Sequence, residues 1–279
     1  GVLDLLHVAA ALFSALLHAG WNAAVKASAS PRDVMSAQMA VGALIVLPAL
    51  FWTGLPAPAS WPWILASTSI NIVTLLALLR AYAISGFGVS YPTVRALSVL
   101  LVVPLAARFA GEHLSAMGLV GMGLVGASLL LIAFGDAKRG GVPRAALVWI
   151  AAAGAGTAAY VLCDAQGVRS SGLPLAYGFV VSICNAVAML ALNSATSSWR
   201  HVARHAVVAT PIAIASMTSY LLILWVWSQA PIAPSAALRD TSAVFALIIA
   251  IVWLKEPFTP LRLFAILLSA AAVPLLRLA

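Results

Sequence analysis

Two arginines lie within apolar stretches of the sequence, each in the same local pattern. Arg95 follows Tyr91 by four residues and precedes Ser98 by three, and Arg239 precedes Ser242 by the same three residues. On a helix, side chains three or four positions apart share one face. A guanidinium presents a planar fork of N–H donors that matches a carboxylate or a phosphate. Both patterns therefore favour an anionic group on a bound ligand. The alternative is that the arginines extend to the membrane surface or pair with Asp164 or Asp240.

The two arginine stretches belong to a longer internal repeat. Three pairs of identical residues share one offset of 144 positions: Arg95 and Arg239, Ser98 and Ser242, and Glu112 and Glu256. Each glutamate stands in a short turn, where we expect it to cap the apolar helix that follows. Matching interruptions in two halves of a membrane chain indicate a transport site or gate. The interruptions identify five candidate hinge or gate residues: Gly86, Gly88, Pro92, Pro231 and Pro234.

The composition is that of a membrane protein. Of 279 residues, 63% are hydrophobic and 8% are charged, and the mean hydropathy is +1.07. Soluble domains carry roughly 25% charged residues. The net charge of +8 comes from basic residues at predicted helix ends and in short loops, where they set topology, so nucleic acid is not an expected partner. Cys163 and Cys184 lie in apolar segments, which predicts buried free thiols.

Apolar runs separated by turn residues predict an all-α integral membrane protein with ten transmembrane helices. Five helices would form a first repeat over residues 1–135, and five a second over 145–279, joined by a polar linker at 136–144. An odd number of helices in each repeat makes the second enter from the opposite face, so the repeats are inverted. The expected spans are 2–27, 33–53, 61–84, 89–109, 114–134, 145–167, 174–193, 206–228, 235–254 and 259–278.

Polar residues on the first and sixth predicted helices extend the candidate site. His18 and Asn22 lie four residues apart on one helix face beside Trp21, and Tyr160 and Asp164 have the same spacing on the equivalent helix. These residues would form the polar side of a binding site. The alternative is that each bonds a nearby backbone group or joins neighbouring helices.

Aromatic residues provide candidates for the apolar side of the site. Tyr82, Tyr91, Trp225 and Trp227 would form a wall against which an apolar group packs, unless they serve only in packing or as interface anchors. No His-Glu-x-x-His motif, Gly-x-Ser-x-Gly motif or usefully spaced carboxylate pair occurs in the sequence. We therefore expect no catalytic residues, no metal site and no cofactor.

The sequence resembles the drug/metabolite transporter superfamily, within it the ten-helix proteins built from two EamA-type domains. The resemblance depends on HAGWNAAVK at 18–26, the Glu112 and Glu256 turns followed by Gly/Ala-rich helices, and the five-plus-five layout of the whole chain. It implies a carrier of the bacterial inner membrane that works by alternating access, with a cavity lined by helices 3, 4, 8 and 9 around helices 1 and 6. Tyr91-Pro92 is similar to the Tyr/Trp-Pro element of aromatic amino-acid exporters.

The expected function is secondary active export of amino acids or related small zwitterionic metabolites. One alternative is export of lipophilic cations. It would require a carboxylate that faces the cavity, and the two arginines would be unfavourable for it. The other alternative is exchange of phosphorylated metabolites. Proton coupling would require a group that titrates in the cavity, for which His18 and Asp164 are the candidates. The protein would act in the bilayer as a monomer or homodimer. The positive-inside rule places both termini outside, whereas the family resemblance places them in the cytoplasm.

Overall fold

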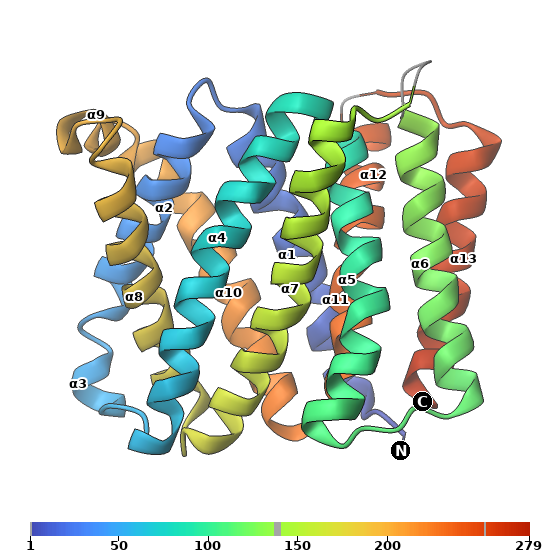
Figure 1. Cartoon of the computed structure of the whole chain (residues 1–279), viewed down its shortest axis with the longest axis horizontal. Coiled ribbons are helices and arrows are strands. Elements are labelled where there is room, and N and C mark those ends of the chain that lie inside the picture. The colour runs from blue at the N-terminus through green and yellow to red at the C-terminus, as the bar shows by residue number, and fades with distance from the viewer. Residues whose placement is uncertain (1, 137–140, 254) are drawn as a thin grey trace.

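The chain folds into a bundle of helices. The computed structural model describes residues 2–136, 141–253 and 255–279 (Figure 1). Part of the predicted linker, residues 137–140, thus lies outside the described residues. The helices are α1 (Leu5–Ala27), α2 (Pro31–Val46), α3 (Leu50–Thr53), η1 (Pro58–Ser60), α4 (Trp61–Ser85), α5 (Phe87–Ala110), α6 (Ala116–Asp136), α7 (Arg144–Ser170), α8 (Pro174–Asn193), α9 (Trp199–Ala203), α10 (Ala206–Gln229), α11 (Ile232–Asp240), α12 (Ser242–Val252) and α13 (Pro260–Arg277).

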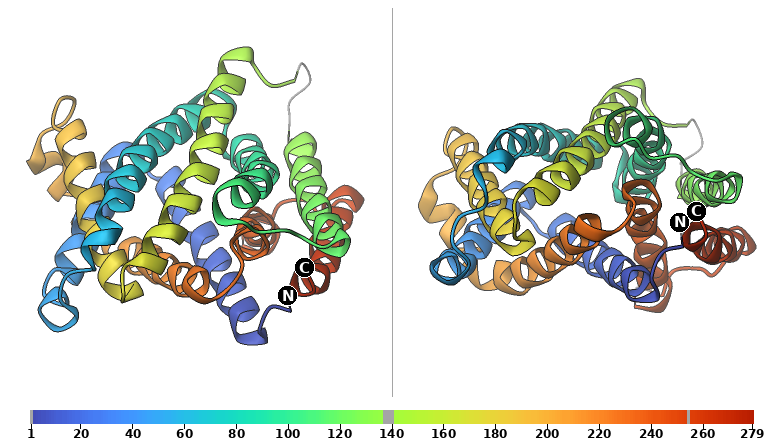
Figure 2. Two further views of the ribbon diagram at one scale, coloured as in Figure 1. Left: turned by 60° about the horizontal axis from the view of Figure 1, so that its bottom comes forward. Right: turned by 90° about the horizontal axis from the view of Figure 1, so that it is seen from below.

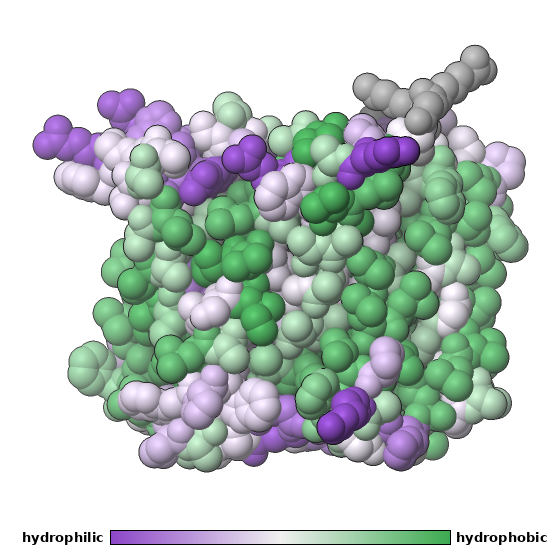
Figure 3. Space-filling view, viewed as in Figure 1, coloured by the Kyte–Doolittle hydropathy of each residue, from purple (hydrophilic) through white to green (hydrophobic). Residues whose placement is uncertain are grey.

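Apolar side chains form a band around the bundle. Within the described residues, nine helical segments are long and apolar enough to cross a bilayer, with α11 and α12 together forming one of them. Figure 3 shows apolar residues over the middle of the visible face and hydrophilic residues along both ends. Leu65 and Val148, for example, are 69% and 66% exposed. Such exposure is unfavourable in water and is expected of side chains that face lipid. The chain is therefore a multi-pass, all-α membrane protein.

Two of the ten expected spans are interrupted, and the first of them is the second span of the chain. The helix predicted over 33–53 ends at Val46, and α3 follows after a turn. Pro48 explains the interruption, because its ring lacks an N–H and clashes with the preceding helical turn. The 16 residues of α2 extend about 24 Å, less than the roughly 30 Å of a hydrocarbon core. This segment is consequently absent from the nine long apolar helices of the described chain.

The predicted helix over 235–254 is divided at Thr241. The Thr241 hydroxyl donates to the carbonyl of Leu238 at 2.5 Å, and the Thr241 N–H is shared between the carbonyls of Ala237 and Leu238. A hydroxyl that bonds its own backbone competes with the regular helix and tightens the turn. The division places Arg239 and Asp240 at the end of α11, next to the interruption.

The helices pack as pairs across the bundle. Helix α4 packs against α7, and α10 packs against α1 (Figure 2). Helix α5 also contacts α7, while α11 and α12 contact α1. The pair α6 and α13 lies at one end of the bundle and the pair α2 and α8 at the other (Figure 1). Both chain ends lie on one edge, where the Leu3 N–H donates to the Arg277 carbonyl at 2.7 Å.

Glycine permits close approach of α7 to the side chains of other helices. A methyl group built on Gly167 would lie 2.4 Å from the hydroxyl oxygen of Tyr177, and one on Gly154 would lie 2.6 Å from a methyl carbon of Leu97. Both distances are too short for real contacts. Small residues at such positions let membrane helices pack without a penalty.

We expect Gly167→Ala to lower the stability of the protein. Tyr177 is fully buried, so its ring cannot move aside without disturbing its neighbours, and overpacking of this kind costs about 1–3 kcal/mol. Gly20→Ala is the matched control, because nothing lies within 4 Å of its added methyl group and alanine favours a helix. Thermal unfolding of the purified variants in detergent measures the difference. Equal melting temperatures for the two variants would contradict the packing assigned to Gly167.

Candidate functional site

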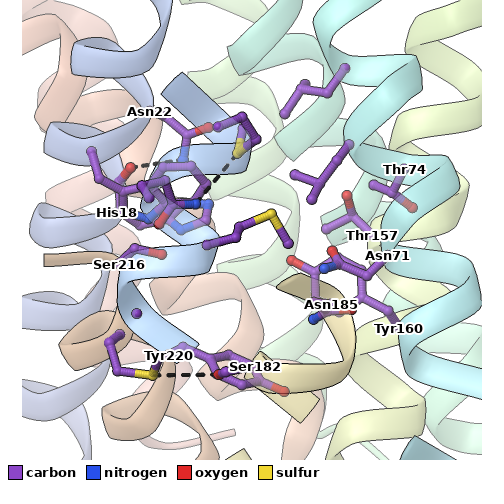
Figure 4. A pocket seen from close by; sticks show the side chains of 18 of the residues that line it. His18, Asn22, Asn71, Thr74, Thr157, Tyr160, Ser182, Asn185, Ser216 and Tyr220 are labelled. Carbon is purple, nitrogen blue, oxygen red and sulfur yellow. Dashed lines mark hydrogen bonds between the residues drawn. The ribbon is translucent and has the colours of Figure 1, made fainter. Parts of the chain in front are cut away.

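A polar cavity lies within the bundle, between α1, α2, α4, α5, α7, α8, α10 and α11. Its volume is about 110 Å³, which is below the roughly 300–1,000 Å³ typical of small-molecule sites. Helices α2 and α8 thus contribute to the wall in addition to the six helices expected from the sequence. Figure 4 shows the polar side chains of the wall: His18, Asn22, Asn71, Thr74, Thr157, Tyr160, Ser182, Asn185, Ser216 and Tyr220.

One side of the cavity is cationic. Arg95 and Arg239 approach the two ring nitrogens of His18, with Arg95 Nη2 at Nε2 and Arg239 Nη2 3.3 Å from Nδ1. The three side chains are only 4–5% exposed. A guanidinium only donates, and a neutral imidazole has one accepting nitrogen. His18 can therefore accept a hydrogen bond from one of the two arginines but not from both.

Arg95 has an anionic partner. Its Nη1 lies 3.1 Å from Oδ1 of Asp240, and both side chains are buried. The Tyr91 hydroxyl, on the same helix, donates to Ser242 Oγ at 2.8 Å. These two contacts join α5 to the two halves of the divided span, α11 and α12. They tie together the parts of the chain that carry the two arginine patterns.

Arg239 has no carboxylate partner among the ion pairs of residues 2–136, 141–253 and 255–279. Its Nε donates to Ser14 Oγ at 3.3 Å, and its other contact is with His18. A buried charge outside an ion pair is costly, and buried charges in membrane proteins are usually functional. Arg239 is thus the cationic group of the cavity wall that remains available to an anion.

The carboxylate of Asp164, also in the cavity wall, is held by three hydroxyls. It accepts hydrogen bonds from Ser67 on α4 at 2.5 Å, Tyr177 on α8 at 3.0 Å and Tyr220 on α10 at 2.8 Å. Asp164 is 1% exposed, and no basic side chain of the described segments lies within ion-pairing distance of it. The wall therefore carries a buried carboxylate that is positioned by neutral donors.

Three further polar atoms of the wall residues have no hydrogen-bond partner among the described residues. They are the indole N–H of Trp21, the amide oxygen of Asn185 and the Nε–H of Arg95. Buried polar groups are normally satisfied, so unpaired ones facing a cavity indicate where water or a ligand bonds. Other polar groups bond their own helix: the Asn22 amide donates to the His18 carbonyl at 2.9 Å and the Thr157 hydroxyl to the Ala153 carbonyl at 2.7 Å.

The cavity brings together about half of the predicted site residues. Those that line it are His18, Trp21, Asn22, Arg95, Tyr160, Asp164 and Arg239. Those that lie outside its wall are Tyr82, Tyr91, Ser98, Trp225, Trp227 and Ser242. Trp227 is fully enclosed in the core, and Trp225 has its ring 4.9 Å from the ring of His7. Tyr91 and Ser242 bond each other behind the wall.

The predicted hinge residues lie at helix junctions. Gly86 joins α4 to α5 with a φ of 80°, a backbone conformation that favours glycine, while Gly88 and Pro92 fall within the first turns of α5. Pro231 is the residue before α11, and Pro234 lies in its first turn. The junctions are therefore at Gly86 and Pro231, and Thr241 adds an interruption that was not predicted.

Several wall residues were missing from the predicted site. Ser67, Asn71 and Thr74 follow a spacing of four and three on α4, the signal that identified the first-helix residues. Tyr177, which holds Asp164 without itself lining the cavity, had no such signal. Three methionines also line the cavity, Met35, Met39 and Met217. Their flexible, polarisable side chains provide an adaptable apolar surface.

Glu112 caps a different helix from the expected one. Its carboxylate accepts the N–H groups of Ile232 at 2.6 Å and Ala233 at 3.1 Å, the first residues of α11. Arg169 lies 3.7 Å from Glu112 and donates to the carbonyl of Trp227 at 2.8 Å. The cap on α6 comes instead from Ser115, which accepts the N–H of Gly118 at 3.1 Å.

The equivalent glutamate, Glu256, is placed differently. It lies 2.9 Å from Arg262, next to the start of α13. The positions equivalent to Ile232 and Ala233 in the first half are Gly88 and Val89, and among the described contacts their N–H groups meet no carboxylate. The start of α11 is thus capped by a glutamate, whereas the equivalent start of α5 has no glutamate cap among the described contacts.

Comparison with solved structures gives a match over the whole chain. A crystal structure of a protein superposes with a TM-score of 0.74 at 15% sequence identity, covering 96% of this chain and 95% of that chain. No family model and no curated protein matches the sequence. At this level of identity the match shows the fold alone.

Proposed function

We propose that this protein is a secondary active transporter of amino acids or related small zwitterionic metabolites. The observation that carries the proposal is the presence of two buried charges of opposite sign in one cavity wall, Arg239 and Asp164, neither of which is in an ion pair among the described residues. An α-amino acid bears a carboxylate that suits Arg239 and an ammonium group that suits Asp164. The remaining wall, with its methionines and amides, accommodates varied side chains.

The packing of the helices supports two inverted repeats over 1–135 and 145–279. Helix α4 of the first half is equivalent to α10 of the second, and α1 of the first half is equivalent to α7 of the second. The contact between α4 and α7 is therefore equivalent to the contact between α10 and α1, and both contacts occur. The pair α2 and α8 and the pair α6 and α13 each join equivalent helices. A pseudo-two-fold axis in the membrane plane produces such packing, and it suits alternating access around a central site. We place the carrier in the bacterial inner membrane, with export as the direction.

Transport into proteoliposomes tests the proposal. Vesicles loaded with a mixture of unlabelled amino acids should accumulate a labelled amino acid by exchange, and protein-free vesicles should not. Competition by the corresponding decarboxylated amine should be weak, because the amine lacks the group that binds Arg239. Absence of exchange for every amino acid would contradict the proposal.

The same assay addresses the competing functions. A carrier of phosphorylated metabolites would use both arginines, yet Arg95 is already paired with Asp240. A carrier of lipophilic cations would use Asp164 and would be hindered by Arg239. Exchange of sugar phosphates or of cationic dyes, with no exchange of amino acids, would establish one of these alternatives instead.

We expect Glu112→Gln to weaken the contact between Glu112 and the start of α11, at the junction of α5, α7 and α11. The open form is the one in which this contact is broken. Glutamine keeps the size of the side chain but loses the charge that favours the start of α11, and one of its two accepting oxygens. Hydrogen bonds to a charged group contribute about 1.5–3 kcal/mol, so the open form should become roughly ten times more populated. Ala233→Cys, in a chain lacking Cys163 and Cys184, allows the opening to be followed by maleimide labelling.

Glu256→Gln is the matched control, because Glu256 makes no contact with α11 among the described residues. It should leave the labelling rate at position 233 within twofold of the parent. Equal labelling rates in the Glu112→Gln and parent backgrounds would show that the glutamate does not hold this junction closed.

A further inference from the structure

A second hollow, separate from the central cavity, opens on the surface near the ends of α1 and α4. Its volume is about 620 Å³. Three basic residues line it: Lys26, Arg32 and Arg80. They come from three different helices, α1, α2 and α4, so the fold and not one local run of sequence gathers them. Three like charges repel one another unless an anion lies between them.

None of these three cations has an anionic partner in the part of the chain that the structure describes. The ion pairs of the described residues include none of them. Arg32 donates to the carbonyl of Leu192 at 3.5 Å, a weak contact, and its Nε is buried without an acceptor. The hollow thus has several N–H donors for which the chain provides no acceptor. This is the donor set expected for a phosphate or a carboxylate.

Tyr82 also lines the hollow but offers no donor to it. Its side chain is 3% exposed, and its hydroxyl, which has no hydrogen-bond partner among the described residues, is enclosed by protein atoms. The anion-binding groups of the hollow are therefore the three basic side chains.

The position of the hollow identifies the ligand as a lipid. Lys26 is the second-last residue of α1 and Arg32 the second residue of α2, so the cations lie at the level where a bilayer has its headgroups. The wall continues along α4 through apolar side chains, including Val73 and Leu76, of which Val73 is 63% exposed. A charged end at headgroup depth followed by an apolar groove fits a phospholipid better than a soluble ion.

We propose that this hollow binds an anionic phospholipid, with its phosphate on Lys26, Arg32 and Arg80 and an acyl chain along α4. Basic pockets between membrane helices recognise anionic headgroups in this way. The site is distinct from the central cavity and does not depend on the proposed transport function. It requires only that the chain lies in a bilayer, as its apolar band indicates.

Retention of lipid by the purified protein tests the site. The protein is exchanged into nanodiscs of phosphatidylcholine with a small fraction of phosphatidylglycerol, and the enrichment of phosphatidylglycerol next to the protein is measured by mass spectrometry. We expect Lys26→Gln/Arg80→Gln to lower the affinity for phosphatidylglycerol by about tenfold or more, since each basic residue contributes to attraction of an anionic lipid. Arg144→Gln/Arg200→Gln is the charge-matched control outside the hollow, for which enrichment should stay at the parent level.

Tyr82→Phe keeps the shape of the wall and all three charges of the hollow. It should bind phosphatidylglycerol as tightly as the parent, and its melting temperature should stay equal or rise, because a buried unpaired hydroxyl is removed. Inorganic phosphate and glycerol phosphate, added at millimolar concentration, should not displace the lipid. Equal enrichment in the parent and in Lys26→Gln/Arg80→Gln would overturn the proposal, as would equal retention of phosphatidylcholine or displacement of the lipid by phosphate.

Discussion

Arg239→Gln is expected to abolish amino-acid transport without destabilising the protein. Arg239 is buried in the cavity wall and contacts only Ser14 and His18, so the fold does not use its charge in an ion pair within the described residues. Because Arg239 is in no ion pair within the described residues, its removal should cost much less than the roughly 3–5 kcal/mol lost when a buried pair is broken. Removing the donor of a bidentate, charge-assisted contact with a substrate carboxylate should lower affinity by about 100-fold. Loss of function with unchanged or higher stability distinguishes a binding residue from a structural one.

Two measurements on the same preparations check this expectation. Isothermal titration with an amino acid gives the affinity, and thermal unfolding without ligand gives the stability. Arg108→Gln removes an exposed arginine near the end of α5, away from the cavity wall, and should change neither value by more than the experimental error. Arg239→Lys keeps the charge without the planar fork and should have intermediate affinity. Parent-like affinity in Arg239→Gln would remove Arg239 from the site.

The residues of the site could be predicted where a regular period placed them. His18 and Asn22 on α1, and Tyr160 and Asp164 on α7, line one cavity because side chains four residues apart share a helix face. The offset of 144 positions between the repeats identified the two arginines, but it could not show that their surroundings differ. Whether an arginine is paired depends on the neighbouring helix, and Asp240 lies beside Arg95 only because α11 packs against α5.

The remaining differences between prediction and structure arise from local competition or from packing. Thr241 divides the predicted span because its hydroxyl donates to a backbone carbonyl, an effect that the mean hydropathy of the span does not show. Tyr177 reaches Asp164 because Gly167 leaves space for its ring, which is a property of two helices together. Trp225 and Trp227 were predicted to form a substrate wall from residue type alone, and the structure places them outside the cavity.

Asp240→Asn is expected to lower the stability of the protein by about 3–5 kcal/mol, because it leaves the buried guanidinium of Arg95 without its carboxylate. Asp4→Asn is the control: Asp4 caps α1 at an exposed position, where asparagine caps equally well, so stability should be unchanged. Unfolding by heat or denaturant in detergent measures both variants.

The double variant Arg95→Met/Asp240→Leu separates the charge effect from a loss of packing. Removing both charges and filling their volume with apolar side chains should recover most of the stability lost in Asp240→Asn, since a buried ion pair is rarely more stable than its hydrophobic replacement. If instead the double variant is as unstable as the single one, the loss comes from other contacts of Asp240. If Asp240→Asn alone is as stable as the parent, then Arg95 does not depend on this carboxylate, and both arginines of the repeat are available to an anionic substrate.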